Sequence, residues 1–241
     1  MTLRAAALAV VLAASTASAQ VTNLIVPGTA DPWLAGMPPG STASLGDTAP
    51  AQSPVLVGGP VNVATGGTLR FAATGEVSNT GVLQGITPDG QGPAAHTTGA
   101  ENGIADVTAP LNGLIGVFLD STQPDLAGPA PAALSFITPA EVGYASLAPG
   151  LRQPFFIGDG LTGTGTGAQQ VVTIPAGATR LYLGTMDGFG WFNNAGQIAV
   201  TVTQAPAAPV APAAPIPLQV APLAALLLAV AALAALRRRP R

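Results

Sequence analysis

Glycine and proline recur along the whole chain, and this sets the strongest limit on its fold. The 241 residues include 30 glycines and 24 prolines. Both residue types interrupt helices and mark turns. The pattern therefore favours short elements joined by many turns over long helices. Hydrophobic residues make up 48% of the chain, so it still has enough apolar side chains to build one core.

The charged residues are few and unevenly placed. There is no lysine, and five of the eight arginines lie near the two ends, while all 11 acidic residues fall between Asp31 and Asp187. This acidic middle part argues against nucleic acid as a partner. It suits a domain that meets cations or neutral glycans, or one that only needs to stay soluble. Because cysteine is absent, a disulfide framework and a thiolate metal site are both excluded.

The first 19 residues have the three parts of a secretion signal. Arg4 supplies the positive charge, an apolar run follows, and Ala17-Ser18-Ala19 is a small-residue cleavage site. We therefore predict a signal peptide over residues 1–19, cleaved between Ala19 and Gln20.

The last 37 residues predict a stalk and a membrane anchor. Residues 205–215 alternate between proline and alanine, which favours an extended linker. Residues 216–241 form the predicted sorting and anchor tail. Within it, Val220 to Leu236 is almost wholly Ala, Leu and Val and is just long enough for a transmembrane helix. Arg237, Arg238 and Arg239 would then stay on the cytoplasmic side.

This tail resembles the sorting tails of exosortase substrates, in which a short proline-containing signature precedes an apolar helix and an arginine cluster. The closest form is the VPLPA type. Here Pro215 and Pro217 belong to the signature, while Ile216 and Gln219 depart from the common form. The resemblance implies an exported protein with an inner-membrane-anchored precursor. A sorting transpeptidase of the exosortase type would then send it to the cell surface or the extracellular matrix.

Between the two ends, the sequence predicts an irregular N-terminal arm over 20–54 and a β-sandwich domain over 55–204. The arm holds one short strand, Val21 to Val26, and Trp33, Leu34 and Met37 are the residues expected to dock it on the body. The body strands are predicted from runs of apolar or alternating residues. Those runs are Val55 to Val63, Thr68 to Val77, Leu111 to Leu119, Gln169 to Ile174, Arg180 to Met186 and Gln197 to Gln204.

The alternation is clearest in the last of these runs, where Ile198, Val200 and Val202 are expected to face inward. No part of the body shows the periodicity of a capped helix. The fold prediction is therefore all-β, as a jelly-roll-like β-sandwich. The segments 75–109 and 120–153 are expected to be long loops, and loops of that length commonly carry function.

The chain offers no recognisable catalytic motif. His96 is its only histidine, and neither a Gly-x-Ser-x-Gly elbow nor a His-Glu-x-x-His helix is present. Its 11 acidic residues leave a carboxylate-only hydrolase open, but nothing singles out a pair. The prediction is that the protein is not an enzyme.

The stretch from Met186 to Gly196 is the most informative part of the body. It combines Asp187, the amides Asn193 and Asn194, several glycines and three aromatic residues, and it joins two predicted strands. Calcium takes carboxylate, amide and backbone oxygens. The stretch therefore predicts a calcium site, while Asn193-Asn194 in a simple hairpin turn is the competing interpretation.

This stretch also resembles the small calcium-dependent galactophilic lectins of bacteria. In their jelly roll, a strand leads into an aspartate, a glycine-containing loop, Asn-Asn, a small residue, Gly and a final strand. The resemblance implies Asp187, Asn193 and Asn194 as calcium ligands, with Asn79 or Thr80 donating a backbone carbonyl. The spacing from Asp187 to Asn193 is one residue shorter than in that family.

The same resemblance implies that Asp187, Trp191, Asn193 and His96 contact a bound sugar. Stacking of Phe189 and Trp191 on a sugar face competes with burial of the aromatic residues in the core. The functional prediction is an exported protein that binds an extracellular glycan or exopolysaccharide in a calcium-dependent, galactoside-like manner. The alternative is a structural surface protein of the biofilm matrix, with calcium at most bracing a loop.

Overall fold

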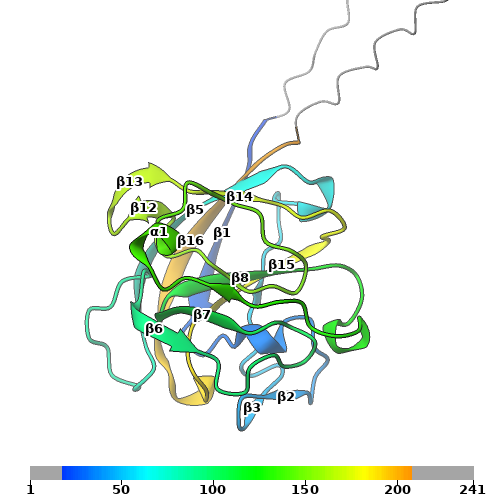
Figure 1. Ribbon diagram of the computed structural model, residues 1–241, viewed down its shortest axis with the longest axis vertical. Helices are drawn as coiled ribbons and strands as arrows, with labels where there is room; N and C mark the ends of the chain where they lie inside the picture. The colour runs from blue at the N-terminus through cyan, green and yellow to red at the C-terminus, as the bar shows by residue number, and fades with distance from the viewer. Residues whose placement is uncertain (1–17, 208–241) are drawn as a thin grey trace, which may run out of the picture. The chain divides into compact units, whose positions relative to one another are not determined.

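The computed structural model describes residues 18–207 of the chain, and Figure 1 shows their arrangement. Strands make up 41% of these described residues and helical elements 8%, which confirms the all-β prediction. The largest sheet has five strands. In spatial order they are β1 (Gln20–Pro27), β16 (Ala195–Ala205), β5 (Thr68–Ser78), β14 (Val171–Thr173) and β10 (Ser146–Leu147).

A second sheet has four strands, and Figure 1 shows β8 of this sheet crossing in front of β1 and β16. Its spatial order is β11 (Phe155–Phe156), β8 (Leu114–Leu119), β15 (Arg180–Thr185) and β4 (Val55–Leu56). All six residues of β8 are buried, so both faces of this strand are covered. The smaller sheets are β6 (Gln91–Ala95) with β7 (Val107–Leu111) and β9 (Leu134–Ser135), β12 (Leu161–Gly163) with β13 (Thr166–Gln169), and β2 (Thr42–Ala43) with β3 (Asp47–Thr48).

Alternation along the long strands explains how the core forms. In β16, Ile198, Val200 and Val202 are 0%, 2% and 0% exposed, as their spacing predicts. In β5, Leu69 and Phe71 are likewise buried on the face expected from the sequence. These inward residues belong to one core cluster with side chains of β8 and β15, so the two larger sheets share a single core.

Three of the predicted strands are interrupted. The run from Val55 to Val63 gives only β4 and then the 3-10 helix η2 (Val63–Thr65), because Gly58, Gly59 and Pro60 end the strand between them. The run from Leu111 to Leu119 contains a turn, since Asn112 has a φ of 66° and separates β7 from β8. The run from Gln169 to Ile174 is divided between β13 and β14.

The segments expected to be long loops contain regular elements. Residues 75–109 include β6 and the start of β7. Residues 120–153 include the 3-10 helix η3 (Pro124–Leu126), β9, the four-residue helix α1 (Pro139–Val142) and β10. Thr138 caps α1 in a capping box with Glu141, a signal that is readable in the sequence.

The expected N-terminal arm is closely joined to the body. Its first strand, β1, pairs with β16 over eight residues, from Gln20 with Gln204 to Pro27 with Gln197. After β1, the 3-10 helix η1 (Pro32–Leu34) buries Trp33 and Leu34 at 0% and 1% exposure, and Met37 is half-buried. Trp33 and Leu34 therefore dock the arm on the core as expected, whereas Met37 is not among the side chains packed on it.

The two ends of the described chain meet at one end of the large sheet. Because Gln20 pairs with Gln204, β16 leads from the loop before Ala195 to the place where β1 begins. Eleven strand residues at about 3.3 Å each separate these points by roughly 35 Å. No helix within residues 18–207 is long and apolar enough to cross a membrane. Most of the predicted signal peptide (residues 1–17) and the tail with Pro215, Pro217 and Arg237 to Arg239 lie outside the described residues.

Candidate functional site

The loop from Met186 to Asn194, here called the distal loop, is held in place by a carboxylate from the N-terminal arm. Trp191 and Phe192 donate their backbone N–H groups to Asp47 Oδ2 and Oδ1, each at 2.8 Å. These residues start the 3-10 helix η4 (Trp191–Asn193), and Gly190 before it has a φ of 75°. Asp47 therefore satisfies the free N–H groups at the start of this turn.

Asp187 opens the distal loop and is buried, with 6% of its surface exposed. Its Oδ1 accepts the backbone N–H of Gly188 at 2.6 Å. Burial raises the pKa of Asp187, whereas the side chain of Asn194 donates to the carboxylate and lowers it. Asn194 Nδ2 also lies 3.2 Å from the carbonyl oxygen of Gly28. Asp187 and Asn194 therefore contact each other, through the amide N–H of Asn194 rather than through the amide oxygen that a calcium ion would need.

The other predicted calcium ligands lie at the same end of the sheet. Asn112 Nδ2 donates to Asn79 Oδ1 at 3.2 Å, and the backbone N–H of Asn112 donates to Met186 just before Asp187. Asn193 is exposed, and its carbonyl oxygen lies near Gly81. The structure thus gathers Asn79, Asn193 and Asn194 around the distal loop, with Asn112 as a neighbour that the sequence did not indicate.

The oxygen atoms present fit a calcium ion in part. Asn194 Oδ1 is buried and has no hydrogen-bond partner among the described residues, so it is a free acceptor beside the Asp187 carboxylate. No group of three or more His, Asp or Glu side chains in residues 18–207 is arranged to hold a metal. A calcium ion here would therefore depend on one carboxylate, amide oxygens and backbone carbonyls.

Trp191 and His96, predicted to contact sugar, are both buried. Trp191 is 0% exposed and its indole N–H donates to Thr185. His96 is 3% exposed and stacks on Trp33 with ring centroids 3.7 Å apart, and the ring of Trp191 lies 5.9 Å from it. The exposed aromatic side chains of the distal loop are instead Phe189 and Phe192, at 55% and 58%.

His96 belongs to a buried polar group, here called the arm cluster, that consists of Asp31, Ser44, Asp47, His96 and Glu101. His96 Nε2 lies 2.7 Å from the Ser44 hydroxyl and Nδ1 lies 2.7 Å from the Gly99 carbonyl. The carbonyl can only accept, so Nδ1 carries a proton. In neutral His96, Nε2 accepts from Ser44. Burial lowers the pKa of His96, and neighbouring Glu101 raises it.

Ser44 and His96 have the spacing of a nucleophile and its base, but their surroundings do not suit catalysis. Ser44 is 0% exposed, so no substrate reaches its hydroxyl. Its backbone N–H donates to the Glu101 carboxylate at 3.1 Å, where a developing oxyanion would meet negative charge. The pair therefore links the β2–β3 turn to the segment around His96.

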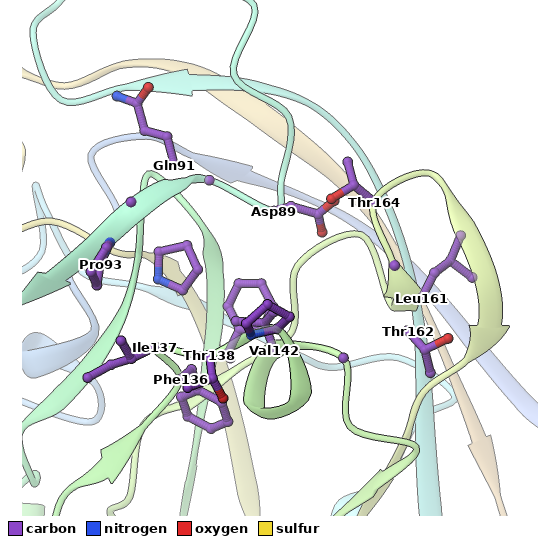
Figure 2. Close-up of a pocket in the computed structure, with 17 residues that line it drawn as sticks. Asp89, Gln91, Pro93, Phe136, Ile137, Thr138, Val142, Leu161, Thr162 and Thr164 are labelled. Carbon is purple, nitrogen blue, oxygen red and sulfur yellow. The ribbon is translucent and has the colours of Figure 1, made fainter.

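A pocket of about 370 Å³ lies elsewhere on the surface, among segments that the sequence did not connect. Its walls are the chain around Asp89 and Gln91, the segment from Phe136 to Gly143 with α1, and the β12–β13 hairpin. Figure 2 shows Asp89 and Thr164 at one rim, with Ile137 and Thr138 at the other. The aromatic rings of Phe136 and Phe156, 6.0 Å apart, are buried beneath it.

Asp89 is the acidic group of this pocket. Its Oδ1 accepts the backbone N–H of Asp159 at 2.8 Å, while Oδ2 is buried without a hydrogen-bond partner among the described residues. Burial raises the pKa of Asp89, and the nearby Asp159 carboxylate raises it further, whereas the Thr164 hydroxyl lowers it. Asp159 in turn accepts from Leu161 and Gly165, which fixes the β12–β13 hairpin.

None of the predicted site residues lines the pocket. Its polar side chains, Asp89, Gln91, Thr138, Thr162 and Thr164, come from the two segments expected to be long loops and from the Thr-Gly repeat at 162–167. Loop length was the available signal, but nothing in the sequence shows that these three segments meet.

Comparisons with known proteins add no relative. No protein-family model matches the chain, and neither a curated protein nor a solved structure matches it.

Proposed function

We propose that this chain is an exported surface or matrix protein that binds a glycan. The observation that carries the proposal is the pocket beside Asp89. A sugar ring has apolar C–H faces and a rim of hydroxyl groups, so it needs an apolar floor with nearby acceptors and donors. Here Phe136 and Phe156 underlie the pocket, while Asp89 and the threonine hydroxyls stand at its rim.

Charge supports a hydroxylated rather than an anionic ligand. No arginine lines the pocket and the chain has no lysine, so a phosphate or carboxylate group would meet Asp89 without a counter-charge. A sugar hydroxyl can instead bond with the threonine hydroxyls at the rim, and with Asp89 once that side chain turns its buried Oδ2 toward the pocket.

Calcium enters the proposal at the distal loop. The free buried oxygen of Asn194 beside Asp187 is the specific observation that favours it. In this arrangement the ion braces the loop that carries the exposed Phe189 and Phe192. The lectin resemblance implies a jelly-roll-like topology and a galactoside bound at this loop through calcium. This is the more specific form of the proposal.

Export and sorting complete the proposal. The signal peptide, the stalk and the exosortase-type tail would carry the protein through the inner membrane to the surface. The first and last strands pair at one end of the sheet, so the chain would leave β16 at the end of that strand opposite to the distal loop.

The test is a glycan array probed with the wild type and three variants, each with and without a calcium chelator. Asp89→Asn keeps the acceptor for Asp159 but removes the charge, so sugar binding should weaken about tenfold. Asp125→Asn, at an exposed carboxylate outside the pocket, should leave it unchanged.

The third variant, Asp187→Asn, separates the two sites. Binding that survives this change and the chelator, but is weakened in Asp89→Asn, assigns the sugar to the pocket. Binding abolished by the chelator and by Asp187→Asn assigns it to the distal loop. No sugar signal in any sample rejects glycan binding and favours the structural matrix protein.

A further inference from the structure

The first strand of the protein leaves one edge of the large sheet open. β1 is the outermost strand and pairs only with β16. From Gln20 to Val26, none of its backbone groups has a partner on the other side within residues 18–207. The opposite edge of the same sheet is β10, which has only two residues. β1 therefore presents a row of free N–H and C=O groups long enough to pair with another strand.

β1 lacks the features by which edge strands usually avoid pairing. Such strands carry charges, internal prolines or bulges, or they are short. β1 reads QVTNLIVP, with no charged residue and a proline only at its last position. Its register with β16 runs over all eight residues without a shift, so no bulge turns the edge away.

The sheet face next to this edge is partly apolar and carries no charge on β1 or β16. Val21 and Ile25 are 44% and 48% exposed. Beside them lies a shallow groove, lined by residues that are small or uncharged: Asn23, Leu24, Ile25, Ala72, Thr74, Ala199, Val200 and Thr201. The acidic residues of the chain all lie between Asp31 and Asp187, so neither β1 nor β16 carries one.

We propose that two copies of this chain pair through β1, edge to edge and antiparallel, joining their five-stranded sheets. The free edge offers backbone donors and acceptors, so its partner must be a β-strand. A second β1 matches it without a charge at the seam, although the rest of each body is acidic. The pairing is isologous, and it closes as a two-fold dimer because each copy has one such edge.

The absence of cysteine makes this geometry directly testable in the full chain. Single cysteines replace the outward residues Val21, Asn23 and Ile25, and a double variant Asn23→Cys/Ile25→Cys covers the register in which these two face each other. Paired strands bring opposite Cβ atoms within about 5.5 Å, close enough for a disulfide after small adjustment. We expect at least one of these variants to form a covalent dimer under mild oxidation.

The matched control places cysteines one strand further in. Thr201 and Ala199 pair with Asn23 and Ile25 on the same face, so Thr201→Cys and the double variant Thr201→Cys/Ala199→Cys should not crosslink. If the protein associated through any other surface, the cysteines of β16 should crosslink as readily as those of β1.

A second measurement uses charge instead of crosslinking. Ile25→Lys puts like charges beside the shared seam, and sedimentation velocity should show a dimer for the wild type and a monomer for the variant. The variant should still unfold cooperatively, because Ile25 lies on the outer face, and its Tm should fall only by the stabilisation that the dimer adds, a difference that shrinks on dilution. A monomeric wild type, or a dimer whose β1 cysteines crosslink no better than the controls, overturns the proposal.

Discussion

The Asp47 carboxylate accepts the backbone N–H of Trp191 at 2.8 Å, across 144 positions of sequence. A second bond, from Phe192 to the other carboxylate oxygen, makes the contact two-pronged. The conformation of the distal loop therefore depends on a residue of the N-terminal arm, a segment that the sequence predicted to be irregular.

We expect Asp47→Ala to destabilise the protein by about 2–4 kcal/mol, because one buried and one partly buried N–H group lose a charged acceptor. Urea unfolding measures this change, and Asp47→Asn should lose less, since it keeps one oxygen. The control is Asp125→Ala, at an exposed carboxylate that accepts only from Gln123, and it should stay within about 0.5 kcal/mol. Equal effects at positions 47 and 125 would contradict the anchoring role.

Asp31 gives a prediction about pH. It is 0% exposed, Oδ1 accepts from Trp33 at 2.8 Å, and Oδ2 has no partner among residues 18–207. Burial raises the pKa of Asp31 well above its ordinary value, and the carboxylates of Asp47 and Glu101 add to this. The folded state therefore binds the Asp31 proton more tightly than the unfolded chain does. Ionised Asp31 destabilises the fold fully at pH values above its raised, folded-state pKa. This cost disappears as the pH falls toward the ordinary pKa of an aspartate.

Asp31→Asn keeps the acceptor for Trp33 and removes the ionisable group. We expect its Tm to exceed that of the wild type near pH 8, by about 2–4 °C for each kcal/mol gained, with the difference shrinking toward pH 4. His96 has a lowered pKa in the folded state, so its contribution to stability rises as the pH rises. This effect is opposite in sign to that of Asp31, but it is present in both proteins and does not enter the difference between their Tm values. A variant less stable than the wild type near pH 8 would show that the charged form of Asp31 is needed.

Gly160 and Gly128 form a matched pair of glycines, with φ values of 89° and 84°. A Cβ at Gly160 would collide with the backbone carbonyl of Phe71, whereas a Cβ at Gly128 meets nothing within 4 Å. Gly128→Ala should cost about 1–2 kcal/mol from backbone strain alone. Gly160→Ala should cost clearly more and disturb the packing of the β12–β13 hairpin on β5. Similar losses in denaturant unfolding would refute a steric role for Gly160.

The predicted signal peptidase site lies at the very start of the described chain. Ser18, Ala19 and Gln20 are exposed, and β1 begins at Gln20. Protein exported by a bacterial host should therefore have an N-terminus at Gln20, as read by intact mass and N-terminal sequencing. An exported protein that retains Met1 would reject the prediction.

Calcium binding can be tested apart from any sugar. Calorimetric titration into chelator-treated protein should show binding for the wild type and a sharp loss for Asp187→Asn, which removes the only carboxylate of the distal loop. Without calcium, the variant should be at least as stable as the wild type, because burial raises the pKa of Asp187 and its charge is unfavourable there. A wild type that binds no calcium at millimolar levels would end this hypothesis.

The parts of the fold that the sequence predicted are those set by local pattern. Alternation in Ile198, Val200 and Val202 marks the buried face of β16 because it depends only on strand geometry. The continuous run from Leu111 to Leu119 hid a turn, since Asn112 can adopt a positive φ without any change in the surrounding apolar residues. Thus strand faces were predictable, while a break inside an apolar run was not.

The candidate site shows the same division. Asp187, Asn193 and Asn194 lie near one another because they share one short loop. The burial of Trp191 and His96 depends on Trp33, which stacks on His96 from the N-terminal arm, and composition does not reveal such a contact. The pocket is built from three distant segments, and its acid, Asp89, has no neighbouring motif in the sequence.

The pairing of Gln20 with Gln204 also sets an order of events for a chain that emerges from its N-terminus. β1 is the first strand to appear, and its partner β16 is the last. The only strand of the sheet that pairs with β1 therefore does not exist until nearly the whole domain has left the ribosome or the export channel. Until then the apolar side chains of β1 have no sheet to join, which makes this fold dependent on late, long-range closure and slow by nature.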